Sequence, residues 1–160
     1  QIPYAIYLKA YSYFERIPDI NLDQKFSTRA YEEFSELINR YPRSKYAVKS
    51  KKHIKKLKNH LAAKEVKVGK YYQSRGDYLA AVKRYKVVLR EYRQSTQIPE
   101  SIFRLIESYV SIGLIKQSYY LFKILEYNSD IREIYSKTAA PPLSIHFLTF
   151  LQTSALSSCF

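Results

Sequence analysis

The side chains that most often bind metals are few in this sequence, and they are not spaced for that task. His53 and His60 are seven residues apart, and no cysteine or acidic residue on that stretch completes a metal set with them. His146 belongs to a different segment, and Cys159 has no second cysteine with which to form a disulfide or a thiolate metal site. The sequence therefore predicts neither a metal nor a cofactor.

Catalytic signatures are also missing. All three glycines, Gly69, Gly76 and Gly113, have positions in a repeat described below, so none remains for a phosphate loop, a dinucleotide fingerprint or a nucleophile elbow.

An acidic cluster is the remaining group with potential acid–base chemistry. It comprises Glu32, Glu33 and Glu36, whose i to i+4 spacing with Arg29 and Arg40 favours ion pairs on the surface of a helix. The sequence contains no pattern of a general acid paired with a general base. We therefore expect no catalytic residues and no enzymatic activity.

Charge and composition limit the partner without naming it. The chain has 160 residues, 46% of them hydrophobic, which fits one globular domain. Its 27 lysine and arginine residues against 14 acidic ones give a formal net charge of +13. Such a charge favours acidic proteins, anionic lipid headgroups or nucleic acid as partners. No apolar run is long enough for a transmembrane helix.

Internal repeats give the strongest structural signal. Two patterns recur along the chain, one that ends in a tyrosine and a glycine and one that places a small, an aromatic and an aliphatic residue at steps of four and three. Small residues allow antiparallel helices to approach, aromatic residues fill the space between helix pairs, and glycines end helices. The positions assigned to this packing are Ala30, Phe34, Gly69, Tyr72, Gly76, Ala81, Tyr85, Tyr109, Gly113 and Phe122.

These patterns resemble the tetratricopeptide repeat over residues 4–127, so we predict an all-α, tetratricopeptide-like helical-repeat solenoid of about three helix pairs. An insertion within Ile17 to Ser27 is expected either to bind a partner or to cap the repeat core. The expected divisions are 1–43 for the first pair with its inserted loop, 44–93 for a long lysine-rich helix and the second pair, 94–128 for the third pair, and 129–160 for an irregular tail.

The lysine-rich helix has ten lysines and one acidic residue, Glu65, within residues 45–70. Its apolar stripe is expected to contain Val48, Ile54, Leu57, Leu61, Val68 and Tyr72. Two interpretations are open for the basic remainder: a solvated side whose lysine stems cover the core, or an electrostatic platform for an acidic partner. The platform would consist of Lys51, Lys52, Lys55, Lys56 and Lys58.

Two longer segments resemble the C-terminal repeats of one family. They read AYEEFSELINRYPRSKYA and KNHLAAKEVKVGKYYQSRGDYLAAVKRYKVVLREY, and they carry the Tyr41-Pro42 helix stop, the Arg75-Gly76 turn and Arg84. Over residues 1–127 the chain resembles the BamD (ComL) family of lipoproteins of the bacterial outer-membrane β-barrel assembly machinery. The stretch 138–160 does not resemble the end of that family and is left open as a tail, an apolar cap or out-of-frame sequence.

The resemblance implies a non-catalytic scaffold at the periplasmic face of the outer membrane, held there by a lipid anchor upstream of this sequence. It also implies that the C-terminal repeats bind the POTRA region of BamA, alongside other subunits of the complex. Arg84 matches a family arginine at that contact, with Lys83 and Arg90 on the same helix. An exposed arginine without such a role remains an equal interpretation.

Two other functions stay open. One is a tetratricopeptide adaptor that binds acidic peptides in another pathway. The other is a basic repeat protein that binds nucleic acid by stacking bases on its tyrosines. Because Tyr72, Tyr85 and Tyr109 are assigned to helix packing and no RNA-binding signature is present, we expect no nucleic-acid partner.

Overall fold

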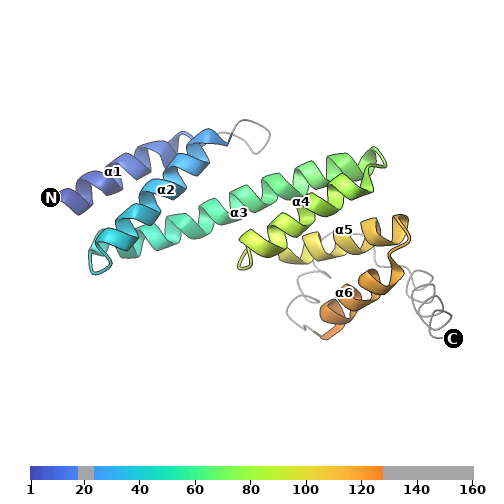
Figure 1. Cartoon of the computed structure of the whole chain (residues 1–160). Coiled ribbons are helices and arrows are strands. Elements are labelled where there is room, and N and C mark those ends of the chain that lie inside the picture. Colours follow the sequence, from blue (N-terminus) through green and yellow to red (C-terminus); the bar gives the residue numbers. More distant parts are fainter. Residues whose placement is uncertain (18–23, 128–160) are drawn as a thin grey trace. The chain divides into compact units, whose positions relative to one another are not determined.

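The computed structural model describes residues 1–17 and 24–127, which form six α-helices (Figure 1). Their bounds are α1 Ile2–Glu15, α2 Lys25–Arg40, α3 Lys45–Ser74, α4 Tyr78–Glu91, α5 Ile98–Ser111 and α6 Ile115–Tyr127. The all-α helical-repeat fold is thus confirmed. The expected tail at 129–160, with His146 and Cys159, and most of the insertion within 17–27 lie outside the described residues.

Local sequence explains where several helices begin and end. Pro3 and Pro99 lie in the first turns of α1 and α5, where the missing backbone N–H costs no hydrogen bond. Asp77 is the N-cap of α4, and its side chain accepts a hydrogen bond from the backbone N–H of Ala80. Helix α2 ends immediately before Tyr41-Pro42, as expected for a residue that precedes proline.

The turns after α3 and α5 have the same construction. Gly76 and Gly113 both adopt the left-handed conformation, with φ of 78° and 77°. The N–H of the next residue then reaches back to a tyrosine carbonyl, from Asp77 to Tyr72 at 3.0 Å and from Leu114 to Tyr109 at 2.8 Å. This is the Schellman arrangement, in which glycine avoids the strain that a Cβ atom would cause.

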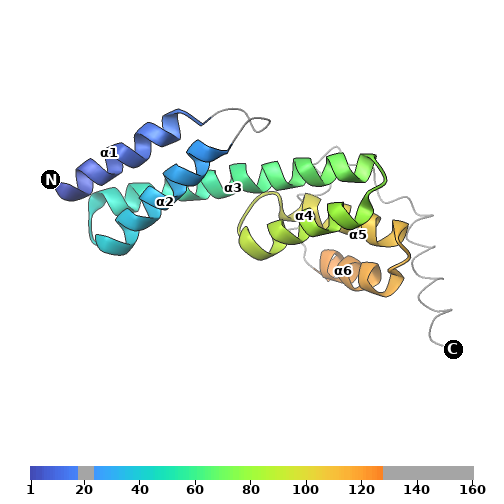
Figure 2. The same ribbon diagram turned by 45° about the horizontal axis from the view of Figure 1, so that its top comes forward.

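The described helices divide into two compact units, and the division falls inside α3 after Lys64. The first unit contains α1, α2 and the part of α3 up to Lys64, with α1 and α2 antiparallel in both views (Figure 2). Its core comprises Ala10, Ala30, Phe34 and Leu57. The two small residues let the helices approach closely enough for the Phe34 ring to be fully buried.

The second unit contains the rest of α3 together with α4, α5 and α6, which run alternately up and down. Gly69 of α3 faces Tyr85 of α4 so closely that an added Cβ atom would lie 2.7 Å from Cζ of the ring. Further along, Ile102, Ile106 and Leu125 form the core between α5 and α6. The interlocking of small and large residues therefore defines this unit.

One part of the expected apolar stripe on α3 is wrong. Val48 has 58% of its surface exposed, whereas Ala47 and Ser50 beside it are fully buried. Ala47 and Ser50 therefore mark the buried side of α3 at this point, and Val48, about 100° around the helix from Ala47, lies outside it.

Candidate protein-binding surfaces

Helix α4 presents a basic side to solvent. Its buried residues are Ala81, Val82, Tyr85 and Val88, which pack into the second unit. The intervening positions therefore point outward and place Lys83, Arg84 and Arg90 on the exposed part of the helix. We call these three residues the α4 basic side.

The guanidinium of Arg84 is only loosely held within the chain. Its Nη1 atom lies 3.3 Å from Oε2 of Glu65 on α3, longer than a typical charge-assisted hydrogen bond. Arg90 pairs with its neighbour Glu91 at 2.7 Å and is largely exposed. Because exposed ion pairs of this kind contribute little to stability, both arginines are available to exchange their carboxylates for those of a partner.

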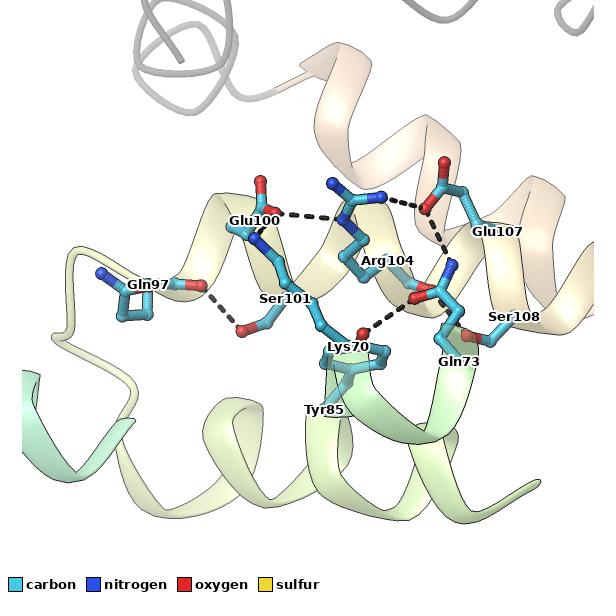
Figure 3. Close-up of polar contacts among 9 residues, drawn as sticks. All are labelled: Lys70, Gln73, Tyr85, Gln97, Glu100, Ser101, Arg104, Glu107 and Ser108. Atoms are coloured by element: carbon cyan, nitrogen blue, oxygen red, sulfur yellow. Dashed lines mark hydrogen bonds and ion pairs between the residues drawn. The ribbon is translucent and has the colours of Figure 1, made fainter. Parts of the chain in front are cut away.

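A second polar site connects α3 with α5 (Figure 3). Lys70 of α3 lies 2.6 Å from Oε1 of Glu100, and Nε of Arg104 donates to the same oxygen at 3.0 Å. The carboxylate is only 15% exposed, so both cations act on it with little screening by water.

The network continues towards the core through Arg104. Its Nη1 atom donates to Oε2 of Glu107 at 3.0 Å, and Nε2 of Gln73 donates to the same oxygen at 3.0 Å. The hydroxyl of Tyr85 donates to Oε1 of Gln73 at 2.8 Å (Figure 3). A buried phenol, an amide and four charged groups are thus joined in one chain of contacts across α3, α4 and α5.

Burial and hydrogen bonding shift the protonation of this network. Burial alone would raise the pKa of the Glu100 carboxyl, but the hydrogen bonds donated by Lys70 and Arg104 outweigh it and hold that pKa below its usual value. Burial raises the pKa of the Tyr85 phenol. Both groups therefore keep their ordinary charge at neutral pH.

An open cavity of about 550 Å³ adjoins the network. Lys70, Gln73, Tyr78, Arg104 and Glu107 contribute to its lining. Its cations are balanced by the glutamates described above, so it offers no net charge with which to attract an ionic ligand. Among the described residues, no group of histidine, cysteine and acidic side chains is arranged to hold a metal ion.

The lysines of the expected platform separate into two groups. Lys51, Lys52, Lys55 and Lys56 are exposed on the first half of α3. Lys58 is half-buried, with Nζ 5.9 Å from the centroid of the Tyr31 ring on α2. The charge of Lys58 thus lies over an aromatic ring, and we call the four exposed lysines the α3 lysine face.

The repeat positions fall mainly in the interior. Ala30, Phe34, Ala81 and Tyr85 are fully buried, and Tyr109 is nearly so. Gly69 is also buried, whereas Tyr72 and Phe122 are half-buried. The exposed members are Gly76 and Gly113, whose part is to turn the chain.

Other contacts were not expected from the sequence. Glu33, assigned to surface pairing on α2, instead lies 2.6 Å from Lys9 of α1, while Glu36 and Arg40 form the expected i to i+4 pair. The contacts of Arg84 with Glu65 and of Lys70 with Glu100 connect residues 19 and 30 positions apart. Such separations match no helical period, so only the repeat register could have suggested them.

Comparison with known proteins gives a consistent family. The family described as YfiO, outer membrane lipoprotein, matches residues 1–123. A protein of Caulobacter vibrioides named outer membrane protein assembly factor BamD is 38% identical over 78% of this chain and 41% of that protein. Its namesake in Rickettsia prowazekii is 35% identical over 84% of this chain and 54% of that protein. The chain thus spans about half the length of these curated relatives.

Proposed function

This chain belongs to the YfiO family of outer membrane lipoproteins, and on that basis we propose that it is a non-catalytic scaffold in the assembly of outer-membrane β-barrel proteins. Relatives that bear the name of an assembly factor support this role. A helical-repeat fold suits it, because stacked helix pairs present long surfaces to other proteins.

Its partner in this proposal is the POTRA region of BamA, bound by the α4 basic side. The observation that carries the proposal is that Lys83, Arg84 and Arg90 are exposed on a helix whose opposite side is anchored in the core. Because the helix is already fixed, binding costs little backbone conformational entropy, which favours it. The core packing of α4 and the partner contact therefore use separate sides of the helix.

Arg84 is proposed to make the central contact. A guanidinium can bind a carboxylate through two parallel N–H donors, and the contact of Arg84 with Glu65 uses only Nη1. A partner carboxylate would either share the guanidinium with Glu65 or replace it. Glu65 is therefore expected to compete with the partner rather than assist it.

We further propose that the scaffold acts at the periplasmic face of the outer membrane. The family description supports the membrane association. None of the helices within residues 1–17 and 24–127 combines the length and apolar character needed to cross a bilayer.

Calorimetric titration of the chain with the POTRA region of BamA from the same organism tests the proposal. We expect saturable binding that Arg84→Ala weakens about tenfold, the loss expected for a partly desolvated ion pair. Arg40→Ala is the matched control, because Arg40 is also an exposed arginine on a second helix of a pair and also contacts a glutamate. Equal losses in the two variants would contradict a site on α4.

A second variant tests the competing carboxylate. Glu65→Gln removes the negative charge beside Arg84 and should strengthen POTRA binding, whereas a supporting role for Glu65 predicts weaker binding. A single-stranded oligonucleotide at two salt concentrations completes the design. Tight, strongly salt-dependent binding of the oligonucleotide without POTRA binding would replace the scaffold proposal with nucleic-acid recognition.

A further inference from the structure

One side of α3 is uncovered in the first unit. The fully buried residues there include Ala47, Ser50 and Leu57, which share one side of the helix at about 100° per residue. The positions roughly half a turn around the helix from them are exposed.

The α3 lysine face occupies this open side. Lys51 and Lys55 form one row along the helix and Lys52 and Lys56 form a second row, each with a step of four residues. Helical spacing places Val48 between the two rows, where its side chain is 58% exposed. The surface thus has two parallel rows of lysines, with an exposed apolar side chain between them at its N-terminal end.

No described carboxylate neutralises the α3 lysine face. Elsewhere in the described residues, lysines find acidic partners, as Lys9 does with Glu33 and Lys70 with Glu100. The four lysines of the face form no ion pair with residues in 1–17 or 24–127. Each i to i+4 pair of like charges costs a helix about 0.2–0.5 kcal/mol. The like charges therefore destabilise α3, and no ion pair within the described residues offsets that cost.

A helix fits this surface in shape. The lysine rows run along α3 at steps of four residues, the spacing of the ridges that pack against a second helix. Opposite charge is what the lysine face lacks.

We propose that the α3 lysine face binds an acidic amphipathic helix of a partner protein. Glutamate or aspartate rows on that helix would meet the two lysine rows, and an apolar residue between them would pack on Val48. This interaction is separate from the α4 basic side and does not depend on what binds there. The chain would in this way hold two acidic partners on two different helices.

A designed peptide tests the proposal on the whole chain. The probe is a synthetic helix with two rows of glutamate on either side of a leucine row, and the variant is Lys51, Lys52, Lys55 and Lys56 changed together to glutamine. We expect the variant to bind at least about tenfold more weakly, from four exposed ion pairs. The matched control changes Arg16, Arg29, Arg43 and Lys116 to glutamine, which removes equal charge from scattered exposed positions.

The controls decide between a site and net charge. Equal weakening by the control variant would overturn the proposal, as would unchanged binding of a peptide with glutamine in place of glutamate. Val48→Ser, which leaves all charges in place, should weaken binding of the peptide modestly. Unchanged affinity would contradict the proposed contact of the peptide's apolar row with Val48. If phosphatidylglycerol vesicles or an oligonucleotide bound more tightly than the peptide, and the lysine variant lost that binding, the proposal of a helical protein partner would be wrong.

Thermal unfolding provides an independent readout. Because the lysine variant removes like-charge repulsion within α3, its melting temperature should equal or exceed that of the unaltered chain. A fall in melting temperature would mean that the lysines support the fold and would contradict a surface kept for binding. POTRA binding should persist in this variant, so the two proposals succeed or fail separately.

Discussion

The two units hold their helices together in different ways. In the first unit, aromatic rings surround an imidazole: His53 stacks on Phe34 with ring centroids 5.0 Å apart and meets Phe14 edge-on at 4.8 Å. In the second unit, small residues interlock with large ones, and the polar network joins α3 to α5. The first arrangement depends on ring packing, whereas the second fixes the register of its helices through directed hydrogen bonds.

The two units differ in whether their buried polar atoms have hydrogen-bond partners. The hydroxyl of Tyr7 lies 3.3 Å from Nε2 of His53, but the buried Nδ1 atom has no hydrogen-bond partner among the described residues. In the second unit the Tyr85 hydroxyl and both polar atoms of the Gln73 amide are bonded. The first unit should therefore lose stability in mild acid, and the second should resist it.

Phe34→Ala should have the largest effect on stability. The ring is fully buried among α1, α2 and α3, so its removal should lower the free energy of unfolding of the first unit by about 4 kcal/mol. Hydrogen exchange should show faster opening at residues 1–64 than in the second unit. Tyr127→Ala, at a ring 95% exposed, is the control and should change little. An equal increase in exchange rate in both units would contradict the prediction that the first unit opens separately.

Gly69→Val should destabilise the second unit in a corresponding way. The added atoms would overlap the fully buried Tyr85 ring, at an expected cost of about 2–3 kcal/mol in chemical denaturation. Ala5→Val, at an exposed helical position, measures the cost of valine in a helix without a steric overlap. Because glycine has a lower helix propensity than valine, propensity alone would not make Gly69→Val destabilising. If the two variants lose the same stability, close packing at Gly69 is not what joins α3 to α4.

Glu100→Gln should weaken the packing of α3 against α5. Loss of the charge-assisted contacts with Lys70 and Arg104 is expected to cost about 1–2 kcal/mol. The folded carboxyl has a pKa below 4.5, so its contribution is present above about that pH and is lost as pH falls through the folded value. Glu91→Gln, which disturbs only an exposed pair, should be nearly neutral in the same denaturation series.

Mild acidification should produce the smallest effect, confined to the first unit because Glu100 of the second unit titrates only below 4.5. Burial, with a further contribution from Lys56, lowers the pKa of His53 below 6.5. Between 6.5 and the folded value the unfolded chain binds a proton that the folded chain does not, so stability falls as pH drops below 6.5. His53→Phe should abolish this response in hydrogen exchange of α1 and α2. Persistence of the response in that variant would assign it to other groups.

Some of these features were accessible from sequence because they are local or periodic. Gly76 and Gly113 end helices through their own backbone conformation, and the small and aromatic positions follow the repeat. The Tyr41-Pro42 stop and the Asp77 cap are equally local. The family resemblance, and with it the fold, rests on such positions.

The remaining features depend on which side of a helix is covered. Val48 is a poor guide because its smaller neighbours Ala47 and Ser50 are the buried residues at the start of α3. The contact of Glu100 with Lys70 and the burial of His53 require the packing of separate helices. The residues assigned to partner contact on α3 and α4 stay predictions, since a binding surface is defined by its partner as well as by its own exposure.

Hydrogen exchange of the chain with and without the POTRA region would show where that region docks, because it reports on both units in one sample. We expect slower exchange on α4, at residues 78–91, that Arg84→Ala diminishes, with α2 unchanged at residues 25–40. Protection confined to the first unit, or none on α4, would contradict the assignment of the α4 basic side as the docking surface.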